Sequence, residues 1–158
     1  MYAHRPLLKE DLETISSFPQ SAEELFYVSP RFQYPLTPDQ IMKVLENRFE
    51  PTVILDEESG QVIAYANLYD IKDEKCWLGN VIVSSSFRGK GAAAYLLQTM
   101  KDKAKTEYGA LQLVLSCAST NSRGLAFYHK LGFKPIGMRI NNIEDQQRVI
   151  TFQMMVEL

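Results

Sequence analysis

Residues 81–94 read Val81-Ile82-Val83-Ser84-Ser85-Ser86-Phe87-Arg88-Gly89-Lys90-Gly91-Ala92-Ala93-Ala94. This order predicts a buried strand, a polar turn and a helix that begins with small side chains. Glycine has no β-carbon to keep a phosphate away from the backbone, and the N–H groups of a first helical turn are free to bind an anion. Because Arg88 and Lys90 add positive charge, the turn is interpreted as a site for a phosphate or diphosphate.

The same turn has three competing interpretations. A P-loop, G-x-x-x-x-G-K-[ST], is excluded because no lysine near the turn follows the required glycine and precedes Ser or Thr. Residues 89–94 do fit the dinucleotide pattern G-x-G-x-x-A, but the next strand ends at Leu115-Ser116-Cys117 without the carboxylate that binds a ribose. The third interpretation is structural: a tight turn whose alanines allow the helix to pack closely.

The sequence on both sides of this segment predicts a mixture of strands and helices. Strands are expected at 2–5, 52–55, 62–69, 76–83, 111–115, 133–141 and 148–156, and helices at 8–15, from 21, from 37 to about 49, at 91–108 and at 121–131. The second and third strands form a hairpin around residues 56–60. The order β-α-α-α-β-β-β-α-β-α-β-β indicates an α+β or α/β domain with a mostly antiparallel sheet and one crossover.

Local signals mark the ends of several helices. Ser21 and Glu24 form an S-x-x-E capping box, and Thr37 precedes Pro38 at the start of the next helix. Gly109 ends the helix predicted at 91–108. One apolar stripe of that helix is expected to face the core: Ala93, Leu97, Met100, Ala104 and Tyr108.

Length and composition favour one folded domain over residues 1–158. The chain is 46% hydrophobic and 23% charged, which excludes a disordered or collagen-like protein. Its net charge of −2 predicts no nucleic acid partner and no attraction to an anionic membrane. No apolar run reaches about 18 residues, and the N-terminus lacks the apolar core of a secretion signal, so a cytoplasmic location is expected.

Cysteine and histidine give no sign of a metal site. Cys76 and Cys117 stand alone in strand-like segments, which predicts buried free thiols. His4 and His129 have no ligand-like neighbours in the sequence. We therefore expect no bound metal.

Two motifs resemble one known family. Residues 88–93 resemble the [QR]-x-x-G-x-[GA] signature of the GNAT superfamily of acyl-CoA-dependent N-acyltransferases. About thirty residues further on, residues 121–133 resemble the family pattern N-x-R-A-x-x-[LF]-Y-x-K-x-G-F, with Gly124 in place of the usual alanine. Two motifs at the expected separation are far more specific than either alone. The resemblance is strong over about residues 60–140.

The resemblance implies a fold and an activity. The fold is α+β in three layers: a GNAT-like, mixed, mostly antiparallel central sheet of about seven strands with helices on both faces. The activity is transfer of the acetyl group of acetyl-CoA to a primary amine of a small molecule, peptide or protein, by direct attack in a ternary complex. The expected assembly is a monomer or a homodimer.

The resemblance also implies the cofactor-binding residues. The coenzyme A pyrophosphate would bind the turn, here Arg88, Gly89, Lys90, Gly91, Ala92 and Ala93. The pantetheine arm would bind like an added strand along Val81, Ile82 and Val83. Asn121 resembles the asparagine that contacts this arm, and it is also an ordinary N-cap residue. Gly79-Asn80 is either a bulge that separates this strand from residues 111–115 or an ordinary strand glycine.

Tyr128 is the candidate catalytic acid. A phenol with a pKa near 10 keeps its proton at pH 7 and can give it to a departing thiolate. The alternative is a helical tyrosine packed beside Phe127 and Phe133.

The base is left open by the sequence. Several family members carry a carboxylate on the strand before the turn, but residues 76–80 contain none. Glu74, Glu23, Glu24 and water are the candidates.

The identity of the acceptor is also open. Aromatic residues at 26, 27, 32 and 34 predict either an aromatic acceptor wall or a small core under a loop. Two other functions compete with acetyl transfer. One is a non-catalytic acyl-CoA-binding module, suggested by the missing carboxylate; the other is a dinucleotide-dependent oxidoreductase, suggested by the G-x-G-x-x-A overlap.

Overall fold

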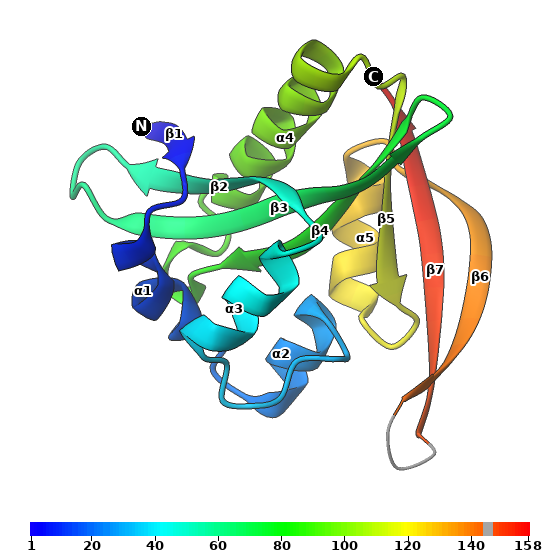
Figure 1. Cartoon of the computed structure of the whole chain (residues 1–158), viewed down its shortest axis with the longest axis horizontal. Helices are drawn as coiled ribbons and strands as arrows, with labels where there is room; N and C mark the ends of the chain where they lie inside the picture. The colour runs from blue at the N-terminus through cyan, green and yellow to red at the C-terminus, as the bar shows by residue number, and fades with distance from the viewer. Residues whose placement is uncertain (144–146) are drawn as a thin grey trace.

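A seven-stranded sheet carries helices on both of its faces (Figure 1). The structure, a computed structural model, describes residues 1–143 and 147–158. Its elements are β1 (Tyr2–Pro6), α1 (Leu12–Ser16), α2 (Ala22–Val28), α3 (Pro38–Leu45), β2 (Phe49–Asp56), β3 (Val62–Lys72), β4 (Lys75–Val83), α4 (Ala92–Tyr108), β5 (Gln112–Ala118), α5 (Ser122–Lys130), β6 (Lys134–Ile143) and β7 (Gln147–Glu157), with short 3-10 helices at Lys9–Asp11 and Ser85–Phe87.

The strand order across the sheet is β1-β2-β3-β4-β5-β7-β6. Only β4 and β5 are parallel among the neighbouring pairs of described strands, and α4 is the crossover that joins them. The predicted mixed, mostly antiparallel sheet of about seven strands is therefore confirmed.

Two hydrophobic cores lie on opposite faces of this sheet. Helix α4 packs Leu97 and Met100 on one face, against Leu113 and Leu115 of β5. Helices α1, α2 and α3 cover the other face. Because successive strand residues point to opposite faces, neighbours such as Val53 and Ile54 of β2 enter different cores.

Strand β4 separates from β5 after its first three residues. The two strands pair only from Lys75 to Trp77. Just beyond, β4 has one more residue than β3 between two paired positions, since Asn67 pairs with Gly79 but Tyr65 pairs with Ile82. The predicted bulge at Gly79-Asn80 is thus confirmed. It turns the second half of β4 away from β5 and leaves that edge without a strand partner among the described residues.

Two details of the sequence prediction are wrong. Helix α3 ends at Leu45, and Phe49 begins β2 instead of ending the helix. In α4 the buried residues include Leu96 and Thr99, whereas Ala93 is half-buried and Tyr108 is exposed and donates a hydrogen bond to Glu50. Ala93 is not fully buried because it lines a cavity beside the first turn of α4.

None of the helices in the described ranges is both long and apolar enough to cross a membrane.

Candidate active site

Two cavities meet where β4 has left β5. The larger, about 590 Å³, lies between α2, β4, the turn after β4 and the first turns of α4 and α5. The smaller, about 280 Å³, lies between the end of α2 and strands β3 to β7. Both are lined by Tyr27, Val28, Val81 and Tyr128. A molecule in one cavity can therefore meet a molecule in the other beside Tyr128.

The turn between β4 and α4 exposes backbone N–H groups to the larger cavity. Gly89 and Gly91 have φ angles of 73° and 85°, in the left-handed region that favours glycine. A β-carbon on either residue would meet nothing within 4 Å, so the glycines serve backbone conformation and open space. The first hydrogen bond of α4 runs from the Tyr95 amide to the Gly91 carbonyl, which leaves the amides of residues 92–94 without helical acceptors. Such a turn can bind an anion.

Almost all the predicted cofactor-binding residues line the larger cavity: Val81, Ile82, Val83, Arg88, Gly89, Gly91, Ala92, Ala93 and Asn121. Lys90 does not. Its ammonium lies 5.4 Å from the centre of the Phe87 ring, and its carbonyl accepts a hydrogen bond from the Tyr2 hydroxyl at 2.7 Å.

The edge of β4 beside the larger cavity has backbone groups available for hydrogen bonding. The Ser84 amide donates to Ile63 of β3 at 2.8 Å. Because backbone amides alternate in direction along a strand, the amide of Val83 points to the opposite side, away from β3. An extended ligand could pair there.

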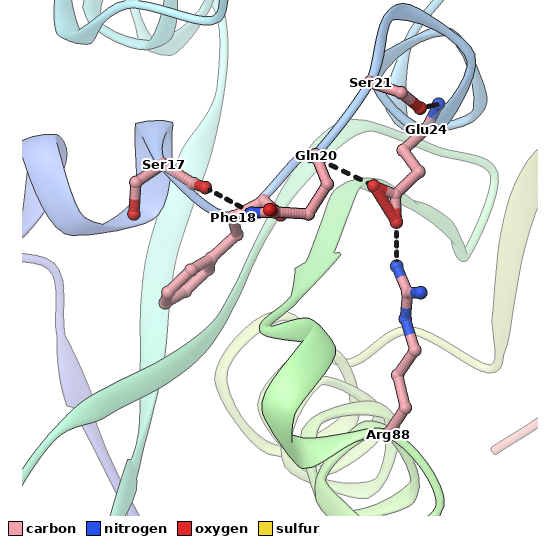
Figure 2. A network of polar contacts seen from close by, with 6 residues as sticks. All are labelled: Ser17, Phe18, Gln20, Ser21, Glu24 and Arg88. Carbon is pink, nitrogen blue, oxygen red and sulfur yellow. Dashed lines mark hydrogen bonds and ion pairs between the residues drawn. The ribbon is translucent and has the colours of Figure 1, made fainter.

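Glu24 binds Arg88 of the turn (Figure 2). Its carboxylate also accepts a hydrogen bond from the Gln20 amide at 2.7 Å. The predicted capping box is therefore half formed: the Ser21 hydroxyl accepts from the Glu24 amide at 3.1 Å, but the carboxylate binds Gln20 and Arg88. Burial alone would raise the pKa of Glu24, and the hydrogen bonds from Arg88 and Gln20 outweigh it, so the pKa is lowered. Glu24 is a poor base as a result.

Tyr128 is half-buried and lines both cavities. Its ring lies 5.4 Å from that of Phe127 and 5.7 Å from that of Phe133, centre to centre, so packing fixes its direction. Both sequence interpretations of Tyr128 are compatible, because a packed ring can still present its hydroxyl to the cavities. Burial, and then the neighbouring Cys117, raise the pKa of Tyr128 above its usual value. The phenol therefore stays protonated well into the alkaline range.

Asn121 caps α5 and lines the larger cavity. Its side-chain oxygen accepts a hydrogen bond from the Gly124 amide at 3.0 Å. A β-carbon at position 124 would overlap the Asn121 side-chain amide. The glycine that replaces the usual alanine thus gives the Asn121 side chain room to fold over the start of the helix.

The base candidates separate clearly by position. Glu23 and Glu74 line neither cavity, and Glu24 is engaged by Arg88. The described lining of the smaller cavity contains no carboxylate and no imidazole.

The aromatic segment is divided between the two predicted roles. Phe26 and Tyr27 line the smaller cavity, whereas Phe32 packs into the core under α1 to α3. Tyr34 is exposed and lies in neither place.

A polar network in the smaller cavity was not predicted from the sequence. Arg48 Nη1 donates to Asn67 Oδ1 at 3.0 Å and to Asn80 Oδ1 at 3.1 Å. Asn67 in turn donates to Asn80 Oδ1 at 2.9 Å and to the Tyr65 hydroxyl at 3.0 Å. Burial raises the pKa of Tyr65 to about 12. Gly79 was the one available signal, because a β-carbon there would overlap Arg48 Nη1.

The cysteines are buried free thiols, as predicted, and burial raises the pKa of each to about 11. Within residues 1–143 and 147–158, no group of histidine, cysteine and acidic side chains could hold a metal ion.

Comparison with known sequences identifies relatives. A family model described as "Acetyltransferase (GNAT) family" matches residues 14–133. Uncharacterized N-acetyltransferases of Mycobacterium bovis and Mycobacterium tuberculosis are 31% identical over 87 residues, which is 55% of this chain and 55% of each relative. The aligned part therefore spans about half the length of these curated relatives.

Solved structures share the fold over the whole chain. A putative phosphinothricin N-acetyltransferase matches 100% of this chain and 99% of its own, with a TM-score of 0.78 and 23% identity. Spermidine N-acetyltransferase from Vibrio cholerae, in complex with CoA and spermine, matches 99% and 95%, with a TM-score of 0.79 and 18% identity. The ribosomal-protein-S18-alanine N-acetyltransferase of Escherichia coli matches 99% and 94%, with a TM-score of 0.74 and 19% identity. At these identities the likeness concerns the fold alone.

Proposed function

The chain belongs to the acetyltransferase (GNAT) family, and we propose on that basis that residues 1–158 form one domain that transfers the acetyl group of acetyl-CoA to a primary amine. One observation carries the proposal: a cavity walled by a glycine turn meets a second cavity beside Tyr128. The acceptor is a small molecule or a peptide.

The residues around the larger cavity fit coenzyme A. The free amides of residues 92–94, with Arg88, would hold the pyrophosphate. Residues 81–83, on the edge of β4 that faces away from β3, would bind the pantetheine arm as a strand partner, beside Asn121. When bound, acetyl-CoA supplies the thioester that an amine attacks, so that a C–N bond forms as the C–S bond breaks.

Tyr128 donates its hydroxyl proton to the sulfur as the C–S bond breaks. A raised pKa keeps this proton in place until negative charge develops beside it.

Water takes the proton from the attacking amine, because the described lining of the smaller cavity offers no carboxylate and no imidazole. The rate at limiting acceptor is then expected to rise about tenfold per pH unit up to the pKa of the acceptor and to level off above it. An α-amine with a pKa of about 7.8 should approach its plateau at about pH 9, and a lysine-like amine with a pKa of about 10.4 should still be rising there. Initial rates of thiol release measure both profiles. A midpoint that is the same for the two acceptors would reveal a base on the protein.

The first test of the proposed function is calorimetric titration with acetyl-CoA, with NADH and ATP as controls. We expect micromolar binding of acetyl-CoA alone, followed by thiol release in a screen of primary amines. Binding without turnover on any amine would favour the non-catalytic acyl-CoA-binding module. Binding of NADH but not of acetyl-CoA would contradict the proposal.

A further inference from the structure

The described lining of the smaller cavity has a net positive charge. It contains Arg31, Arg48 and Arg139 and no aspartate or glutamate. The chain as a whole has a net charge of −2, so this concentration of arginine is local. The larger cavity is lined by Arg88, Arg123 and Lys130 and also by Glu24, which pairs with Arg88. A site with the charge of the smaller cavity favours an anion and repels a cation.

Of the three arginines in the described lining, Arg48 is the one that donates hydrogen bonds to described side chains. Both hydrogen bonds of its Nη1 go to side-chain amide oxygens, those of Asn67 and Asn80. Its guanidinium carbon lies 4.1 Å from the centre of the Tyr69 ring. The missing side chain of Gly79 leaves the space in which Nη1 lies. Three contacts therefore fix the direction of a long and otherwise flexible side chain.

The remaining donors of Arg48 have no partner within residues 1–143 and 147–158. Neither Nε nor Nη2 makes a hydrogen bond there, and no described carboxylate forms an ion pair with the guanidinium. Asp70 acts on it only through space. The edge formed by Nε and Nη2 matches the two oxygens of a carboxylate. A partly desolvated guanidinium is costly unless a second charge completes it.

We infer, on the basis of the proposed function, that the acceptor is a small primary amine that also carries a carboxylate or a similar oxyanion, and that Arg48 binds this oxyanion. Arg139, whose guanidinium carbon lies 5.6 Å from the centre of the Trp77 ring, and the exposed Arg31 add charge at the same cavity. The amine itself points to the junction at Val81 and Tyr128, where the two cavities meet. Amine and oxyanion thus occupy opposite ends of one molecule.

The size of the cavity argues for a small acceptor. Drug-sized ligands occupy pockets of about 300–1,000 Å³, and this cavity measures about 280 Å³. An amino acid or a compound of similar size fits this space. Polyamines are disfavoured, because their positive charges would be brought close to three arginines without a counterion.

The test compares acceptors that differ in charge at the end remote from the reacting amine, with kcat/KM expressed per neutral amine so that differences in amine pKa are removed. In wild-type protein, an amino acid is expected to react with a kcat/KM at least about tenfold above that of its carboxamide and of a diamine of equal length, since a hydrogen bond to a charged group contributes about 1.5–3 kcal/mol. Arg48→Gln should remove about 10- to 100-fold from the carboxylate acceptor and less than about threefold from the carboxamide. Equal losses on both acceptors would show that Arg48 only supports the fold, and would overturn the inference. A wild-type preference for the diamine or the carboxamide would overturn it as well.

Gly79→Ala provides a second variant in case Arg48→Gln fails to fold. The new methyl group would overlap Arg48 Nη1 and lie 2.9 Å from Asn67 Oδ1 and Tyr69 Cε1, so the end of the Arg48 side chain is displaced and its two neighbours must shift slightly. A thermal melt of the variant checks that the fold persists. We expect the same selective loss on the carboxylate acceptor, and an unchanged preference for it would contradict the inference. Calorimetry with acetyl-CoA and a screen of other amines separate this inference from the proposed function. If only the inference fails, acetyl-CoA still binds and other amines are still acetylated. If the proposed function fails, no amine is acetylated.

Discussion

Tyr128→Phe is expected to slow acetyl transfer about 100-fold while acetyl-CoA binds within about threefold of wild type, because general acids contribute about 10²–10⁴-fold to rate. The variant keeps the ring packed between Phe127 and Phe133 and removes only the hydroxyl. The loss should therefore be in kcat. Stopped-flow or steady-state thiol release gives the rate, and calorimetry gives the affinity.

A matched control is available in the same cavities. Tyr27 also lines both cavities, but its hydroxyl donates its proton to the Thr120 carbonyl at 3.2 Å, so that proton is already engaged. Tyr27→Phe should change kcat by less than about threefold, the effect of one lost exposed hydrogen bond. If both variants lost rate equally, or if Tyr128→Phe kept wild-type turnover, the proton donor would lie elsewhere.

The raised pKa of Tyr128 adds an expectation for pH dependence. A phenol whose pKa lies above its usual value of about 10 stays protonated up to that higher pH. The wild-type rate should therefore show no alkaline decline below about pH 10. A decline between pH 8 and 9 would contradict the assignment of the acid to this residue.

Gly91→Glu is expected to weaken acetyl-CoA binding by at least about 100-fold, because it adds negative charge at the end of α4 where the free amides would bind the pyrophosphate. The new side chain meets no protein atom within 4 Å of its β-carbon, so it projects into open space at the cavity. The backbone φ angle of 85° at position 91 strains any residue other than glycine by about 1–2 kcal/mol.

Gly91→Ala carries the same strain without the charge. Both variants should therefore melt at a similar temperature, below that of wild type, and the alanine variant should lose less than about tenfold in affinity. Calorimetric titration with acetyl-CoA and a thermal melt of each variant make the comparison. Wild-type affinity in Gly91→Glu would place the cofactor in another part of the molecule.

The sheet and the larger cavity could be predicted because their signals are local. The glycine turn, the helix that follows it and the second motif each lie within a few residues of sequence, and strand periodicity gave the order of the elements. The end of α3 was wrong because Leu45 and Phe49 keep helical spacing although the chain has already turned into β2.

The smaller cavity could not be predicted in the same way. Arg48 reaches Asn67 and Asn80, which follow it by 19 and 32 residues on two different strands. Glu24 and Arg88 are 64 residues apart. Contacts of this kind form only when folding brings distant parts of the chain together, so residue spacing along the sequence does not predict them.

The bulge in β4 keeps the two cavities open, but it also removes backbone hydrogen bonds that β4 could make to β5. A strand one residue shorter at Gly79-Asn80 could continue its ladder along β5 beyond Trp77, with backbone hydrogen bonds that contribute about 0.5–1.5 kcal/mol each. The same change would close the space in which both cavities meet. Selection for heat resistance alone would therefore favour variants that lack the bulge. A screen for stabilised forms of the protein should measure activity as well as melting temperature.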